Sequence, residues 1–233
     1  MSLLKVEDLV SYIGLFTILQ GVNLEIEQGE AVAILGRNGA GKTTFLRTLM
    51  GLVKTRSGSM EFDGKSLVGV PAHKVSHLGI GYCPEDYGVF DSLSVEENLL
   101  LAMHKDDGET RSRIEYVLDL FNDLKLAYKR PARTLSGGQR QMLSVGRSLV
   151  NETKLILIDE PSKGLAPVVI EKMALALREI SKQSTILLVE QNFNMACAVA
   201  NRYYIIDEGR TVHNGLIADL VEDKELQSTH LGL

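Results

Sequence analysis

The most informative part of the sequence is a glycine-rich turn that reads Gly36-Arg37-Asn38-Gly39-Ala40-Gly41-Lys42-Thr43. It matches the P-loop pattern, in which two glycines separated by four residues precede Lys and then Ser or Thr. The five residues before the turn, Ala31–Leu35, are all apolar and predict a buried strand. A helix is expected from about Lys42 to Met50. The turn therefore has the strand–turn–helix setting that a phosphate-binding loop requires.

The residue types in this turn suit a polyphosphate. Glycine lets the backbone take conformations closed to residues with a side chain, so the N–H groups can turn inward around the anion. The N-terminus of the following helix adds its positive dipole end. Lys42 can reach the β and γ phosphates, and Thr43 offers a hydroxyl to Mg²⁺. The expected nucleotide-binding residues are Gly36, Arg37, Asn38, Gly39, Ala40, Gly41, Lys42, Thr43 and Thr44.

Composition places the chain among ordinary globular proteins. Its 233 residues include 25 basic and 30 acidic side chains, a net charge of −5, and 45% are hydrophobic. The mild acidity argues against a nucleic-acid binder held by phosphate contacts. Apolar runs are much shorter than the ~20 residues of a membrane span. The first residues become acidic at once, so we expect no signal peptide.

Strand-like and helical segments alternate along the chain, which predicts an α/β fold. Between Asp91 and Asn151 the pattern becomes helical, with one amphipathic helix over 111–124 and a capped helix start at Ser94. A peripheral helical segment is expected over 215–231. Besides Ala31–Leu35, the expected strands are Leu3–Val10, Val22–Ile26, Met60–Asp63, Gly79–Cys83, Leu155–Ile158, Thr185–Val189, Tyr203–Asp207 and Arg210–His213.

These patterns predict one domain over 1–233. Residues 1–86 and 151–233 are expected to form an α/β core, whose first strands make an antiparallel β subdomain. Residues 87–150 are expected to form an inserted helical subdomain.

Two acidic residues follow the apolar run Leu155–Ile158. In a parallel sheet, this strand would end at the edge from which the phosphate turn opens. We therefore expect Asp159 to hold Mg²⁺, directly or through water, and Glu160 to orient or deprotonate the attacking water near the γ-phosphate. The alternative is that the two are solvated acids ending a strand, and the presence of the P-loop disfavours it.

A third motif is Leu135-Ser136-Gly137-Gly138-Gln139, in which Ser136 caps a helix and the glycines expose its first N–H groups. With the P-loop before it and Asp-Glu-Pro after it, the order of motifs resembles the nucleotide-binding subunits of ATP-binding cassette (ABC) transporters over essentially the whole chain. The resemblance implies a RecA-like P-loop NTPase core, an N-terminal antiparallel β subdomain and an inserted helical signature subdomain.

The resemblance also implies partners. In that family Ser136, Gly137 and Gly138 would cap the γ-phosphate held by a second ABC ATPase subunit, in a homo- or heterodimer that encloses two ATP molecules. Integral membrane permease subunits, and indirectly an external solute-binding protein, are expected. Nucleic acid is not. The location implied is peripheral, on the cytoplasmic face of the inner (plasma) membrane.

Single positions carry over from the family in the same way. Tyr12 matches the residue that stacks on adenine, although it could be an ordinary strand tyrosine. Glu85 matches a residue that contacts Mg²⁺, where glutamine is usual, and Gln191 matches a contact of the γ-phosphate, where histidine is usual. Ala166 replaces a usual aspartate. The expected catalytic set is Glu160, Gln191 and Lys42, and the expected metal set is Thr43, Glu85 and Asp159.

These departures have chemical consequences. A carboxylate at position 85 can bind Mg²⁺ but repels a triphosphate. A glutamine amide at position 191 can donate a hydrogen bond but cannot be protonated near neutral pH.

Several short segments resemble the shorter ATPase subunit of branched-chain amino acid importers, and urea or amide importers share much of the pattern. They include Val-Glu-Glu-Asn-Leu (95–99), Gly-Leu-Ala-Pro (164–167) and Leu-Val-Glu-Gln-Asn (188–192). Asp86-Tyr87-Gly88 departs from it at the expected permease interface. An export-type ATPase of the lipopolysaccharide-transport kind, a non-transport ABC ATPase and a small-molecule kinase remain alternatives. The compact single cassette disfavours the non-transport class, and the signature helix disfavours the kinase.

Overall fold

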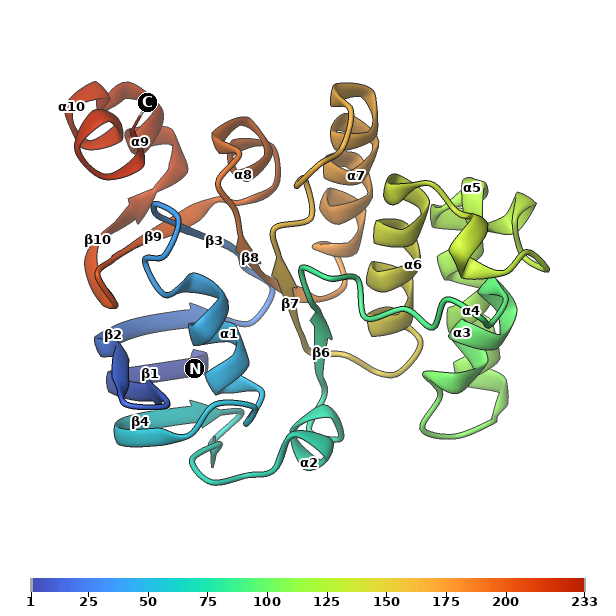
Figure 1. Cartoon of the computed structure of the whole chain (residues 1–233), viewed down its shortest axis with the longest axis horizontal. Coiled ribbons are helices and arrows are strands. Elements are labelled where there is room, and N and C mark those ends of the chain that lie inside the picture. Colours follow the sequence, from blue (N-terminus) through green and yellow to red (C-terminus); the bar gives the residue numbers. More distant parts are fainter. Residues whose placement is uncertain (1, 233) are drawn as a thin grey trace.

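The computed structural model describes residues 2–232 and contains two sheets (Figure 1). The smaller sheet is antiparallel with strand order β2-β1-β4-β5. Its strands are longer than predicted, because main-chain pairing of β1 with β2 continues to Ile13 and Phe16 beside the turn. Its strands are β1 (Ser2–Ile13), β2 (Phe16–Glu27), β4 (Thr55–Phe62) and β5 (Lys65–Ser66).

The larger sheet has strand order β10-β9-β3-β8-β7-β6, and all neighbours except the β9–β10 hairpin run parallel. The predicted hairpin turn at Glu208-Gly209 is confirmed, with both residues at positive φ. The α/β fold class predicted from the sequence is thus confirmed. The strands are β3 (Ala31–Leu35), β6 (Ile80–Cys83), β7 (Leu155–Asp159), β8 (Thr185–Val189), β9 (Arg202–Asp207) and β10 (Arg210–Leu216).

Helices cover both faces of this sheet. The longer helices are α1 (Lys42–Leu49), α3 (Val95–Leu101), α4 (Gly108–Leu120), α6 (Gly137–Leu149), α7 (Pro167–Ile180) and α8 (Phe193–Val199). The shorter segments are α2 (Ala72–Ser76), α5 (Asn122–Leu126), α9 (Ile217–Glu222), α10 (Lys224–Leu226), a 3₁₀ turn (Ala132–Thr134) and a π turn (Gln227–Leu231). None of the helices within residues 2–232 has the length and apolar character needed to span a bilayer.

Two helix predictions are corrected. The single helix expected over 111–124 is wrong: α4 ends at Leu120 and α5 begins at Asn122. Between them Phe121 leaves helical geometry, with φ −118° and ψ 75°, and its side chain is buried in the core. The C-terminal helical stretch expected over 215–231 starts only at Ile217, because residues up to Leu216 pair in β10. It is divided into short pieces, and between the first two Asp223 leaves helical geometry, with φ −89° and ψ 86°.

The side chains of the parallel strands alternate between two cores. Leu155 and Leu157 of β7 pack with α1 and the antiparallel sheet, whereas Ile156 and Ile158 pack with α6 and α7. Helices α1 and α6 therefore cover opposite faces of the larger sheet, and Figure 1 shows them on either side of β6 and β7. Helices α3 to α6 fall within the segment predicted to be helical, and Ser94 caps α3 as predicted.

Gly146 lets α6 approach α4 closely, which gives a test of this packing. A Cβ at position 146 would lie 2.6 Å from Cγ1 of buried Val117. We expect Gly146→Ala to lower the free energy of unfolding by about 1–2 kcal/mol in urea titrations, because overpacking outweighs the gain in helix propensity. The control is Gly108→Ala at the start of α4, where nothing lies within 4 Å. Equal stability of the two variants would contradict the close approach.

Candidate functional site

The glycine turn after β3 closes around the ammonium group of Lys42. Lys42 is only 4% exposed, and its Nζ donates to the carbonyl oxygens of Gly36 (2.8 Å) and Arg37 (3.1 Å). Burial lowers the pKa of Lys42, although neighbouring carboxylates oppose this effect. The turn predicted from the sequence is therefore held in shape by its own lysine.

The β9–β10 hairpin supports this turn from behind. Gly36 has φ 147°, and a Cβ there would lie 2.2 Å from the carbonyl oxygen of Ile206, so no larger residue fits. The N–H of Gly209 donates to the carbonyl oxygen of Ala40 (2.9 Å). Backbone contacts from β9 and the hairpin turn thus fix the phosphate loop.

Thr43 and Asp159, two members of the predicted metal set, are in direct contact. Thr43 Oγ1 donates to Asp159 Oδ1 (3.1 Å), and the fully buried Oδ2 has no hydrogen-bond partner. Burial raises the pKa of Asp159 to about 6, while the Thr43 hydrogen bond opposes the rise. A hydroxyl beside a carboxylate with one unpaired oxygen is a donor set that fits a hard cation such as Mg²⁺.

Other ligands of such a cation would have to come from elsewhere. Within residues 2–232 no group of three or more His, Cys, Asp or Glu side chains is arranged to hold a metal. Magnesium commonly takes one or two carboxylates and completes its shell with substrate phosphates and water. The third residue of the predicted metal set, Glu85, pairs with Lys163, and its role as a metal ligand stays a prediction.

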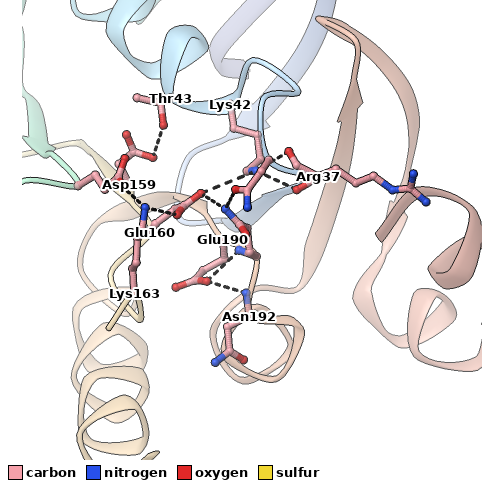
Figure 2. A network of polar contacts seen from close by, with 12 residues as sticks. Arg37, Lys42, Thr43, Asp159, Glu160, Lys163, Glu190 and Asn192 are labelled. Carbon is pink, nitrogen blue, oxygen red and sulfur yellow. Dashed lines mark hydrogen bonds and ion pairs between the residues drawn. The ribbon is translucent and has the colours of Figure 1, made fainter. Parts of the chain in front are cut away.

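Glu160 lies at the centre of the polar network in Figure 2. Its Oε1 accepts a hydrogen bond from Gln191 Nε2 (2.6 Å) and lies 3.8 Å from Lys42 Nζ. Its backbone has φ 47°, a left-handed conformation that costs about 1–3 kcal/mol in a residue with a side chain and tends to persist at functional sites. The N–H of Glu160 donates to Val189 O (2.9 Å), which fixes this conformation against β8.

Gln191 joins the glycine turn to Glu160, because its side-chain amide also contacts the Asn38 carboxamide. The structure therefore brings together three residues that the sequence placed in separate motifs. A cavity of about 320 Å³ opens beside them. It is lined by Asn38, Glu160, Ser162, Lys163, Glu190, Gln191 and Asn192.

Glu190 is a structural anchor that the sequence reasoning did not single out. It is 1% exposed, and its carboxylate accepts the backbone N–H groups of Ser162 (2.9 Å), Gln191 (2.9 Å) and Asn192 (2.8 Å). Burial raises the pKa of Glu190, and these hydrogen bonds oppose the rise. The available signal was an acid directly after a buried strand with a four-residue apolar run, 186–189, a pattern like the one that identified Asp159.

The signature helix forms with the predicted cap. Ser136 Oγ accepts from Gln139 N (3.2 Å), and Gln139 Oε1 accepts from Ser136 N (3.0 Å). A Cβ at Gly138 would lie 2.6 Å from Val169 of α7, which explains the glycine there. Because α6 and α1 cover opposite faces of the sheet, the signature residues are separated from the glycine turn of their own chain.

The remaining predicted contacts are on other elements. The guanidinium of Arg56 lies over the ring of Tyr12, 4.9 Å from its centre, and contacts its hydroxyl. Arg37 of the glycine turn donates to the carbonyl oxygen of Thr229 near the C-terminus (3.1 Å). The adenine-stacking role of Tyr12 stays a prediction.

Comparisons with known proteins agree with this geometry. The sequence profile of the ABC transporter family matches residues 19–163. The chain is 38% identical to the high-affinity branched-chain amino acid transport ATP-binding protein BraG of Pseudomonas aeruginosa, over 99% of this chain and 100% of that protein. It is 37% identical to the probable branched-chain amino acid transport ATP-binding protein LivF of Archaeoglobus fulgidus, over 93% of each. It is 29% identical to the lipopolysaccharide export system ATP-binding protein LptB of Escherichia coli K12, over 92% of this chain and 91% of that protein.

Solved structures give the same result. A nucleotide-free ATP-binding cassette from an ABC transporter matches with a TM-score of 0.84 and 26% identity, over 97% of both chains. A cassette of an ABC transporter in its ADP conformation matches with a TM-score of 0.82 and 26% identity, over 97% of this chain and 96% of the other. This chain therefore belongs to the ABC transporter family, as an ATP-binding subunit that hydrolyses ATP for a transporter.

Proposed function

We propose that the chain is the shorter ATPase subunit of an importer for branched-chain or closely related amino acids. The observation that carries the proposal is its full-length similarity to BraG and LivF, at 38% and 37% identity. The similarity to the exporter subunit LptB is lower, at 29%. An exporter and an importer of urea or amides are the alternatives.

The glycine turn would hold the triphosphate of ATP. Lys42 would contact its β and γ phosphates, and the Thr43 hydroxyl with the buried carboxylate of Asp159 would hold Mg²⁺, which withdraws negative charge from the phosphate oxygens. The lysine is already fixed by the carbonyl oxygens of Gly36 and Arg37, so little reorganisation is needed when the nucleotide enters.

Glu160 would act on the attacking water. Its carboxylate lines the cavity beside the glycine turn, where a γ-phosphate would end. Gln191 donates to Oε1 and thereby orients the carboxylate, and Glu190 holds the backbone of both loops in place. Glu160 would then accept the proton of the water as its oxygen bonds to the γ-phosphorus, while the bond from phosphorus to the β–γ bridging oxygen breaks and ADP leaves.

A second subunit would complete each site. The helix that begins at Ser136, Gly137 and Gly138 packs on the other face of the sheet from α1, so its N–H groups would serve the nucleotide of a paired ATPase subunit. We infer that this subunit is a related chain or a second copy of this one. Permease subunits would anchor the pair at the cytoplasmic face of the membrane.

Glu160→Gln should nearly abolish hydrolysis and spare binding. The amide cannot accept the proton of the water, so turnover should fall by at least about a hundredfold, while affinity for MgATP stays within about threefold. Phosphate release and equilibrium binding measure the two effects. Glu171→Gln, at an exposed position of α7, is the control. Unchanged turnover in Glu160→Gln would assign the base elsewhere.

Gln191→Ala should lower kcat with little change in KM. The substitution removes the amide that orients Glu160, so we expect a loss of at least about tenfold in kcat. Gln191→His should recover much of the activity, because an imidazole N–H can donate to the same carboxylate. Steady-state kinetics measure both variants. An alanine variant as active as the parent would remove Gln191 from the mechanism.

The transported solute is tested on the intact membrane complex. Purification through this chain should recover integral membrane subunits, and ATPase activity should rise severalfold when leucine, isoleucine or valine is added with the cognate binding protein. Stimulation by urea or short amides alone would support the urea/amide alternative. Recovery of lipopolysaccharide with the complex would support the exporter.

A further inference from the structure

Lys163 lies between two carboxylates that belong to different loops. It follows β7, and Glu85 follows β6, the neighbouring parallel strand, in which Cys83 is paired with Ile158. Both loops therefore leave the same edge of the sheet. Lys163 Nζ pairs with Glu85 Oε1 and also lies 4.0 Å from Glu160 Oε2. Figure 2 shows the side chains of Lys163 and Glu160 next to each other.

Negative charge is in excess at this edge. Burial lowers the pKa of Lys42, and four carboxylates that act on it from nearby oppose this effect. These are Glu160, Asp159, Glu190 and Glu85. The lysines that compensate them are Lys42, which is buried inside the glycine turn, and Lys163, which lines the cavity beside Glu160. A polyphosphate entering here adds further negative charge, so an uncompensated carboxylate would oppose binding.

We propose that Lys163 is a positioning residue that holds the Glu85 carboxylate and cancels its charge, so that this edge of the sheet accepts a nucleotide phosphate. The same ammonium ties the loop of Glu85 to the loop of Glu160. The inference rests on the proposed nucleotide site. Lys163 would affect nucleotide binding only by neutralising Glu85. With Lys163 present, a glutamate at position 85 would repel the phosphates less.

Two other interpretations make different predictions. An exposed ion pair often contributes nothing measurable, and the Lys163 side chain is 62% exposed. In that case its removal changes no affinity. A lysine that contacts the phosphate directly would matter equally with or without Glu85. Only a lysine that acts through Glu85 loses its effect when Glu85 is made neutral, which a double-mutant cycle detects.

The experiment measures ADP binding to the full chain by calorimetry, in EDTA and again in Mg²⁺. In EDTA, Lys163→Gln should weaken ADP binding by about five- to tenfold, because Glu85 then repels the phosphates. Glu85→Gln should bind ADP at least as tightly as the parent. The double variant should stay within about twofold of Glu85→Gln. In Mg²⁺ the loss in Lys163→Gln should shrink, because the cation can neutralise Glu85.

Lys182→Gln is the matched control, since Lys182 is similarly exposed and pairs with Glu179 at the C-terminal end of α7, whereas Lys163 precedes the start of that helix. Its affinity should not change. Equal losses from Lys163→Gln in both backgrounds, or no loss in either, would overturn the role of Lys163. Absence of ADP binding by the parent chain would instead contradict the nucleotide site itself. Urea unfolding of each variant verifies that the fold is retained.

Discussion

The site depends on the hydrogen bonds between the buried ammonium group of Lys42 and the backbone of its own loop. A lysine inside a protein must be compensated, and here two carbonyl oxygens of its own loop and nearby carboxylates do so. The same contacts shape the loop that would receive a phosphate. The positive charge is thus paired with backbone dipoles that a nucleotide can supplement without rebuilding the loop, and this arrangement is what electrostatic preorganisation requires.

The alternation of side chains along the parallel strands separates the phosphate loop from the signature helix. Successive side chains of β7 enter different cores, so the helix that carries the phosphate loop and the helix that carries the signature must lie on opposite faces of one sheet. The phosphate loop and the signature helix of this chain therefore belong to separate faces of the sheet. In the proposed function, this separation is the reason that a second subunit would complete each nucleotide site.

Much of this could be predicted from local sequence. The apolar runs of β3 and β8 gave their boundaries, and the motifs gave Lys42, Thr43, Asp159, Glu160 and the Ser136 cap, because each signal lies within a few residues of its effect. Other features depend on distant contacts. The break at Phe121 follows from what its ring packs against, and the polar start of β4 is set by pairing with β1. Glu190 and the Lys163–Glu85 pair join loops that are far apart in sequence. The spacing of apolar and polar residues within a short segment cannot predict such contacts.

The phosphate loop is sensitive to changes in the β9–β10 hairpin that packs behind it. Ile206 O closes the space beside Gly36, Gly209 N holds Ala40 O, and Gly209 O accepts from Gln20 N of the antiparallel sheet. A residue inserted at this turn would shift the wall against which the phosphate loop rests, although it would touch no ligand. Fluorescent tags and peptide insertions should therefore avoid the turn at 208–209, and natural length variation within the family should be rare there.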